Sequence, residues 1–197
     1  MKNLWCVFTG ELPDEIVQAI IKETYKYEYK KAEIGTESDE KGLIVDTNVR
    51  RSDIKFINSY KSKFITDLIM HYTRIANRLD FGFDIDGVQD IQYTEYNAED
   101  KGFYDWHTDA GWCDNSFMFQ RKISMSIQLS DGDEYEGGDF EIQSSGWEDF
   151  CKSLPDGGIR SKGTIIVFPS FASHRVTPVT KGTRKSLVSW IDGSMFR

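Results

Sequence analysis

Arg121-Lys-Ile-Ser-Met-Ser-Ile-Gln-Leu-Ser130 alternates apolar and polar side chains from its third residue onward. Successive side chains of a β-strand point to opposite faces, so this strand would have one apolar face and one small or polar face. If the apolar face lies under an amphipathic helix, the polar face lines a barrel interior, where a polar ligand can bind. The alternative is a polar face in solvent, which would leave the N-terminal helices without an apolar sheet face to cover. The apolar set is Ile123, Met125, Ile127 and Leu129, and the polar set is Ser124, Ser126 and Gln128.

The period of two recurs through the chain after Asp84, where turns rich in Gly, Asp and Asn interrupt it. This pattern predicts an antiparallel β core. Seven or eight short strands preceded by helices indicate a mainly β protein of the α+β class, with a double-stranded β-helix (jelly-roll) core. The predicted strands cover residues 87–96, 103–109, 121–130, 138–143, 163–168, 173–179 and 183–192.

Two helices are predicted before the β core. The first begins at Pro13, because proline is tolerated at the first helical position, and ends near Tyr29. The second is capped by Ser52 or Asp53 and carries apolar residues at steps of three and four. Its predicted apolar stripe is Ile57, Tyr60, Phe64, Leu68, Tyr72, Ile75 and Leu79. A chain of 197 residues suits one domain over 1–197, with helical support in 1–82 and the jelly roll in 84–193.

Composition narrows the class of partner. Hydrophobic residues make up 39% of the chain, and the formal net charge is −8. An acidic chain disfavours nucleic acid and anionic membranes as partners, and no apolar run approaches the roughly 20 residues of a membrane span. Residues 1–8 are better explained as a first strand than as a secretory signal. Three scattered cysteines suggest neither a disulfide framework nor a zinc site, so a cytoplasmic location is expected.

Potential metal ligands lie in two strand-like segments. Tyr104-Asp-Trp-His-Thr-Asp109 places His107 and Asp109 on the same side of a strand. A His-x-Asp pair alone often occurs by chance, but His174 lies in a second such segment, residues 171–177. Two histidines and one carboxylate on one face of a metal are the arrangement expected for non-haem Fe(II) oxygenases.

Further residues support this interpretation. Arg184 follows His174 by ten positions, and residues 136–140 read Glu-Gly-Gly-Asp-Phe between the two ligand segments. With these features, residues 90–192 resemble the 2-oxoglutarate and Fe(II)-dependent dioxygenases, in the prolyl 4-hydroxylase-like branch that includes the PKHD-type hydroxylases. The resemblance implies Fe(II), 2-oxoglutarate and O2, with ascorbate as a candidate accessory. It also implies hydroxylation of an unactivated C–H bond, with release of succinate and CO2.

The resemblance also assigns residues to the co-substrate. Arg184 suits the far carboxylate of 2-oxoglutarate, because a guanidinium is a planar fork that stays charged when buried. Tyr96 is similar to a family tyrosine that donates its hydroxyl to the same carboxylate. Gln128 stands where some prolyl hydroxylases carry another tyrosine. The competing candidates are Lys181 and Lys185 for the cation and Tyr93 for the tyrosine.

A substrate surface is predicted beside the metal ligands. Its candidate residues are Tyr104, Trp106, Arg175 and Arg51, together with the rest of the segment 50–52 and the aromatic loop 110–120. Kinship with prolyl hydroxylases implies a peptidyl proline or another protein side chain as substrate. Alternatives are hydroxylation of a free amino acid or small metabolite, and a cupin-like metal-binding barrel that is not an oxygenase.

Overall fold

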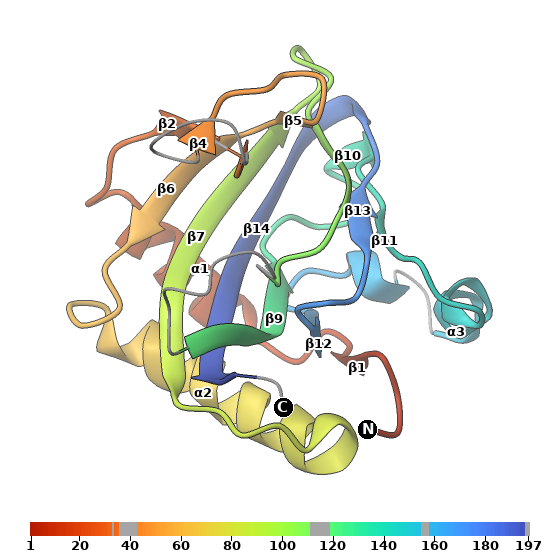
Figure 1. The fold of residues 1–197 in the computed structure, drawn as a ribbon. Coiled ribbons are helices and arrows are strands. Elements are labelled where there is room, and N and C mark those ends of the chain that lie inside the picture. The colour runs from red at the N-terminus through yellow and green to blue at the C-terminus, as the bar shows by residue number, and fades with distance from the viewer. Residues whose placement is uncertain (33, 36–42, 111–118, 155–157, 196–197) are drawn as a thin grey trace.

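The computed structural model describes residues 1–32, 34–35, 43–110, 119–154 and 158–195. Every strand pairing in these ranges is antiparallel, and the strands form a large sheet, a small sheet and one two-stranded ribbon (Figure 1). The large sheet runs in the order β1 (Cys6–Phe8), β12 (Ile165–Pro169), β9 (Phe119–Gln128), β14 (Val179–Ser194), β7 (Gly87–Asn97), β6 (Asp53–Ile57) and β2 (Lys30–Lys31), and β10 (Tyr135–Gly137) pairs with β14 beside this path. The small sheet runs in the order β11 (Phe140–Ile142), β13 (His174–Val176), β8 (Phe103–His107) and β5 (Arg50–Arg51). The ribbon pairs β3 (Ile34–Gly35) with β4 (Leu43–Ile44).

The two longest helices lie on the side of the large sheet that faces away from the small sheet, whereas the short helix of residues 147–153 lies beside β11 of the small sheet (Figure 1). The described helices are α1 (Asp14–Thr24), α2 (Lys63–Ala76), which continues into a π-helical turn (Asn77–Phe81), α3 (Trp147–Ser153) and a short 3-10 turn (Gly158–Arg160). Ile20 of α1 and Ile65 and Ile69 of α2 are fully buried in one core with the apolar residues of β9. A second core, which includes Phe140, Val176 and Phe168, fills the space between the two sheets. No helix in the described ranges has the length and apolar composition needed to cross a bilayer.

The alternation of β9 is confirmed. Ile123, Met125, Ile127 and Leu129 are buried in the helix-facing core. On the opposite face, Ser126 lines an internal cavity and Ser124 donates a hydrogen bond to Asp109. Both faces of β9 are therefore buried, one against helices and one against a polar cavity.

The N-terminal third differs from its prediction. β1 confirms the first strand predicted in residues 1–8, but β2, β5 and β6 also precede residue 82, so this region contributes strands to both sheets as well as helices. Residues 53–57, predicted as the start of the second helix, pair with β7 instead, and α2 begins only at Lys63.

The predicted stripe on α2 was also wrong by one position. The buried face consists of Ile65, Ile69, Met70, Thr73 and Ala76, whereas Tyr60 is 95% exposed and lies before the helix. Leu68 and Tyr72 pack only at the margin of the core. α1 is shorter than predicted, because it ends at Thr24 rather than near Tyr29.

Candidate metal centre

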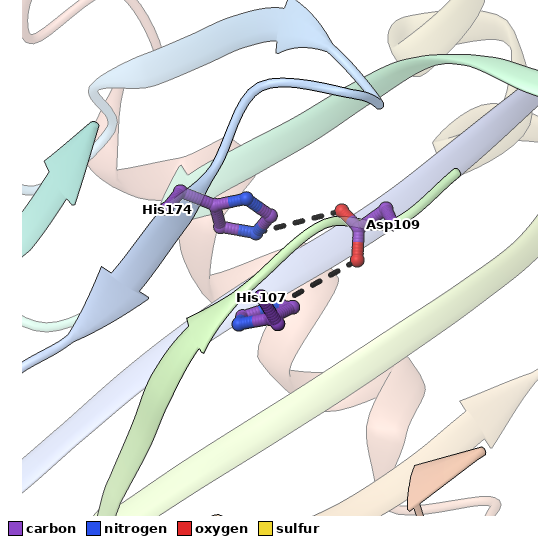
Figure 2. A group of neighbouring side chains, drawn as sticks. All are labelled: His107, Asp109 and His174. Atoms are coloured by element: carbon purple, nitrogen blue, oxygen red, sulfur yellow. Dashed lines mark ion pairs between the residues drawn. The ribbon is translucent and has the colours of Figure 1, made fainter. Parts of the chain in front are cut away.

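Three side chains from neighbouring strands of the small sheet converge. His107 ends β8 and His174 begins β13, and the two residues are direct partners across this antiparallel pair. Asp109 follows two residues after His107. Its Oδ1 lies 3.8 Å from His107 Nε2, and its Oδ2 lies 3.5 Å from His174 Nε2 (Figure 2). One ligand atom from each of the three residues lies within 4.8 Å of the others, a spacing that a single metal ion can bridge.

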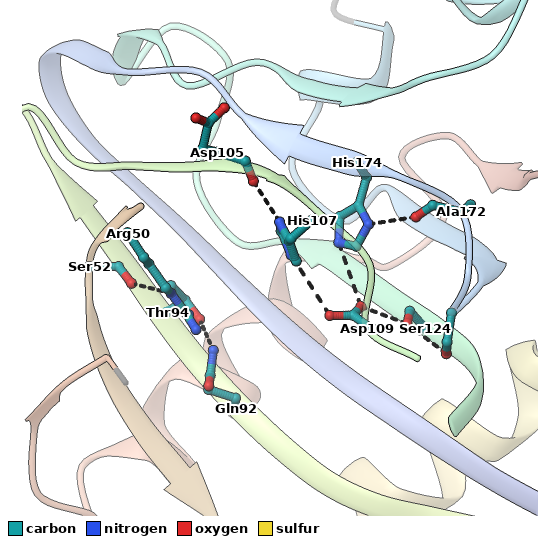
Figure 3. A network of polar contacts seen from close by, with 11 residues as sticks. Arg50, Ser52, Gln92, Thr94, Asp105, His107, Asp109, Ser124, Ala172 and His174 are labelled. Carbon is teal, nitrogen blue, oxygen red and sulfur yellow. Dashed lines mark hydrogen bonds and ion pairs between the residues drawn. The ribbon is translucent and has the colours of Figure 1, made fainter. Parts of the chain in front are cut away.

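Hydrogen bonds set the orientation of both imidazoles (Figure 3). His107 Nδ1 donates to the carbonyl of Asp105 at 2.7 Å, and His174 Nδ1 donates to the carbonyl of Ala172 at 2.9 Å. A carbonyl oxygen can only accept, so each Nδ1 carries a proton and each Nε2, the atom nearest Asp109, is the nitrogen available to a metal. Burial, followed by the neighbouring His174, lowers the pKa of His107 to about 3, which keeps this ring neutral. Neutral imidazole is the form that binds metals.

A hydrogen bond from Ser124 on β9 stabilises the carboxylate form of Asp109. The Ser124 hydroxyl donates to Oδ2 at 2.7 Å and contacts the Ser170 hydroxyl at 2.9 Å. Burial alone would raise the pKa of Asp109, but the positive charge that His174 or His107 carries when protonated, together with the Ser124 hydrogen bond, outweighs burial and sets the pKa below its usual value. The donor set of two neutral nitrogens and one anionic oxygen fits a divalent cation, with part of the coordination sphere left free.

A buried arginine lines the same cavity. Arg184 on β14 is 1% exposed and has no carboxylate partner among the described residues. Its Nη2 donates to Gln128 Oε1 at 2.6 Å, its Nη1 donates weakly to Ser186 at 3.4 Å, and its Nε has no partner. An unpaired buried guanidinium is costly, and a carboxylate bound in the cavity would compensate its charge. The residues present therefore fit a carboxylate ligand that reaches from the metal to Arg184.

Gln128 lies behind this arginine rather than on the cavity wall. Its Oε1 accepts from Arg184, and its Nε2 donates to the Tyr135 hydroxyl at 2.9 Å. The guanidinium of Arg160 lies 4.2 Å from the centre of the Tyr135 ring and also donates to the Tyr135 carbonyl. Gln128 therefore belongs to a chain of contacts that supports Arg184, and its contact with the co-substrate stays a prediction. Gly138 packs against the same side chain: a Cβ built there would lie 3.1 Å from Arg184 Cδ.

Tyr96 and Tyr104 are both on the cavity wall. Tyr96 on β7 is the register partner of Arg184, and its ring centre lies 5.5 Å from the guanidinium. Tyr104 stacks on the His107 ring with centroids 3.4 Å apart, and burial raises the pKa of Tyr104 to about 12. Tyr104 therefore stays protonated beside the metal ligands.

Three predicted substrate residues lie outside the cavity. Trp106 and Arg175 alternate with His107 and His174 along their strands, so they project from the opposite face of the small sheet. There the Arg175 guanidinium lies 4.6 Å from the Trp106 ring centre and pairs with Glu141 at 2.7 Å. Both line a separate groove. Arg51 also points away, donating to the Thr47 carbonyl.

Within the predicted segment 50–52, Arg50 rather than Arg51 faces the cavity. It is 6% exposed and lines the cavity, and its guanidinium lies 4.6 Å from the centre of the Tyr104 ring. Most of the predicted loop 110–120 falls outside the described residues. The other cavity residues not singled out from sequence are Gln92, Phe140, Phe168 and Val176. For Gln92, the signal was available, because it shares strand parity with Tyr96 on β7.

Comparisons with known proteins agree with this geometry. Residues 91–192 match the model of the 2OG-Fe(II) oxygenase superfamily. A PKHD-type hydroxylase from Synechococcus is 38% identical over 89 residues, covering 45% of this chain and 37% of that protein. One from Colwellia psychrerythraea is 34% identical over 91 residues, covering 46% and 38%. The matched region thus spans well under half the length of these curated relatives.

Solved structures with a similar fold cover nearly the whole chain. The viral collagen prolyl hydroxylase of Paramecium Bursaria Chlorella virus-1 has a TM-score of 0.66 at 20% identity, covering 97% of both chains. A Pseudomonas putida prolyl-4-hydroxylase has a TM-score of 0.65 at 19% identity, covering 98% and 94%. A Trichoplax adhaerens prolyl hydroxylase, solved with a peptide of hypoxia inducible factor, has a TM-score of 0.66 at 13% identity, covering 96% and 83%. At these identities the likeness shows the fold, which is the predicted jelly roll.

Proposed function

The chain belongs to the 2OG-Fe(II) oxygenase superfamily, and from this membership we propose that it is an Fe(II)- and 2-oxoglutarate-dependent hydroxylase of an unactivated C–H bond. One observation carries the proposal. The His107, Asp109 and His174 cluster and the unpaired guanidinium of Arg184 line a single cavity. We propose that the two sheets and their helices form one oxygenase domain.

Each side chain has a defined task in this proposal. His107, Asp109 and His174 hold the metal, and Arg184 pairs with the far carboxylate of 2-oxoglutarate while the Tyr96 hydroxyl donates to it. Bound Fe(II), with 2-oxoglutarate and O2, supplies the oxidising chemistry, and succinate and CO2 are the expected by-products. Ascorbate as an accessory and a cytoplasmic location stay predictions from the sequence.

Two substrate classes are supported by different observations. The prolyl hydroxylases of similar fold, one of them solved with a peptide, support a peptidyl proline or another protein side chain. The unpaired charge of Arg50 in the cavity supports a substrate that carries a carboxylate, which a free amino acid or small metabolite can supply.

Anaerobic addition of Fe(II) and 2-oxoglutarate tests the reaction class. We expect a weak visible charge-transfer band and, after admission of O2, succinate. His107→Ala and Asp109→Ala should lose both signals, while His71→Ala, the matched control at an exposed position of α2, should keep them. A cupin-like barrel that is not an oxygenase would give no band. Undiminished succinate in both ligand variants would show that the assignment of these ligands is wrong.

A further inference from the structure

Arg50 places a second unpaired cation in the cavity. Its side chain leaves β5 and its Nε donates to Ser52 Oγ at 2.9 Å (Figure 3). The two terminal nitrogens make no hydrogen bond or ion pair with any described residue. The contact with the Tyr104 ring, which in turn stacks on His107, sets this guanidinium next to the metal ligands.

A count of formal charge shows why Arg50 needs a partner. Asp109, Arg184 and Arg50 are the charged side chains on the cavity wall among the described residues, because imidazoles that bind a metal are neutral. A divalent metal, one carboxylate ligand, a dianionic keto acid and Arg184 together sum to zero. Arg50 therefore leaves one positive charge uncompensated in a buried site, a condition that costs several kcal/mol unless an anion arrives.

We propose that the substrate of this site carries a carboxylate that pairs with Arg50. This inference rests on the proposed function and names the substrate class of the same cavity. A guanidinium fork suits a carboxylate because it can donate two parallel hydrogen bonds. The carboxylate can belong to a free amino acid or other small acid, or to an acidic residue of a peptide.

The surroundings of Arg50 provide an approach for such an anion. Arg50 lines both the metal cavity and an outer groove, which is also lined by Lys31 and Arg51. Lys31 is already paired with Asp53 at 2.7 Å. The unpaired and buried cation at the boundary between groove and cavity is therefore Arg50, and a substrate entering from the groove would meet it before the metal.

A binding experiment tests the proposal without turnover. Acetate, the simplest alkyl carboxylate, is titrated into the full chain loaded with Mn(II) and saturating 2-oxoglutarate, so that Arg184 is occupied. The thermal midpoint is followed against chloride at equal ionic strength. We expect a saturable rise for the wild type and for Arg51→Gln, and an apparent Kd at least about tenfold higher for Arg50→Gln. Equal responses of the wild type and Arg50→Gln, or no saturable response of the wild type, would overturn the proposal.

A substrate panel then identifies the source of the carboxylate. Succinate formation is measured with free amino acids, their carboxamides, and end-capped peptides with either acidic or neutral residues. We expect the wild type to prefer members with a carboxylate by at least about tenfold in kcat/KM, and Arg50→Gln to lose that preference. Stimulation by free acids alone identifies a small-molecule substrate, and stimulation by capped acidic peptides identifies a peptidyl one. Equal turnover of a neutral capped peptide by both proteins contradicts the proposal, and a panel without any turnover leaves the decision to the acetate titration.

The anaerobic charge-transfer band shows whether the proposed function fails or only the inference about the substrate fails. If neither the wild type nor Arg50→Gln forms the band, the proposed function fails. If both form it and acetate binding does not depend on Arg50, only the inference about the substrate fails.

Discussion

Arg184→Met separates co-substrate binding from fold stability. The methionine keeps an apolar stem of similar length but removes a guanidinium that is 1% exposed and has no carboxylate partner in the described part of the chain. Losing one partner of a buried charge pair costs about 2–5 kcal/mol, so the half-saturating 2-oxoglutarate concentration should rise about 30-fold to several-thousand-fold. Metal affinity should stay nearly unchanged, because Arg184 contacts none of the three ligands.

Without co-substrate, the Arg184→Met protein should be about as stable as the wild type or more stable, although its affinity for 2-oxoglutarate is lower. Replacing buried charge by apolar atoms is often neutral or stabilising by about 1–4 kcal/mol, and Gln128 loses one hydrogen bond of about 1 kcal/mol. The free energy of unfolding should therefore change by between about −1 and +3 kcal/mol. Urea denaturation measures it, and titration of the anaerobic band measures 2-oxoglutarate binding. Lys185→Met, on the other face of β14, is the matched control. An unchanged 2-oxoglutarate requirement, or a stability loss above about 2 kcal/mol, would refute the reasoning.

Three further predictions concern the groups around this site. Tyr135→Phe removes the acceptor of Gln128 and should raise the half-saturating 2-oxoglutarate concentration about 3- to 10-fold in the same titration, whereas Tyr72→Phe, remote on α2, should not change it. Ser124→Ala should weaken metal binding about 10- to 100-fold in a chelator competition, because Asp109 loses its supporting hydrogen bond; unchanged affinity would count against that support. Burial lowers the pKa of His107 from 6.5 to about 3, so metal-free stability should be fully present above pH 6.5 and decline as pH falls toward 3. His107→Gln should flatten that decline in denaturation curves, and equal slopes would contradict it.

The β core was predictable because burial on two different sides leaves a period of two in the sequence. β7 spans Gly87–Asn97 where residues 87–96 were predicted, and β9 has the apolar and polar faces that its alternation indicated. The prediction for residues 138–143 was coarser, because the structure has β10 ending at Gly137 and β11 starting at Phe140. Gly137 and Gly138, both with positive φ, separate these strands.

The N-terminal region was harder because two apolar periods overlap there. Ile54 and Ile57 are three residues apart, which fits a helix, but β7 offers a neighbouring strand edge and tertiary pairing decides the outcome. In α2, Phe64 and Leu68 continue the predicted stripe, yet the parallel stripe of Ile65 and Ile69 is the one that is fully buried. Sequence periodicity gave no means to choose between adjacent stripes.

At the site, strand parity predicted well wherever strands are long. By strand parity Arg184 shares a face with Ser186, Val188 and Trp190, and all four line the cavity. Strand parity could not decide which of Arg50 and Arg51 faces the cavity, because β5 has only two residues and therefore no alternation to follow. Strand parity placed Gln128 on the correct face. It could not show that Gln128 donates to the Tyr135 hydroxyl, because Tyr135 lies on β10, which pairs with another part of β14.

The register of β14 links the core to the co-substrate site. Leu187 and Ile191 are buried under the helices, while Arg184 faces the cavity with the opposite parity. A slip by one residue would exchange the two faces and bring Lys185 to the position of Arg184. It would also move both apolar side chains toward the polar cavity, at about 1.5–3 kcal/mol for each one. The hydrophobic core that α1 and α2 close therefore fixes which basic residue meets the co-substrate, although neither helix contributes a side chain to the cavity wall among the described residues.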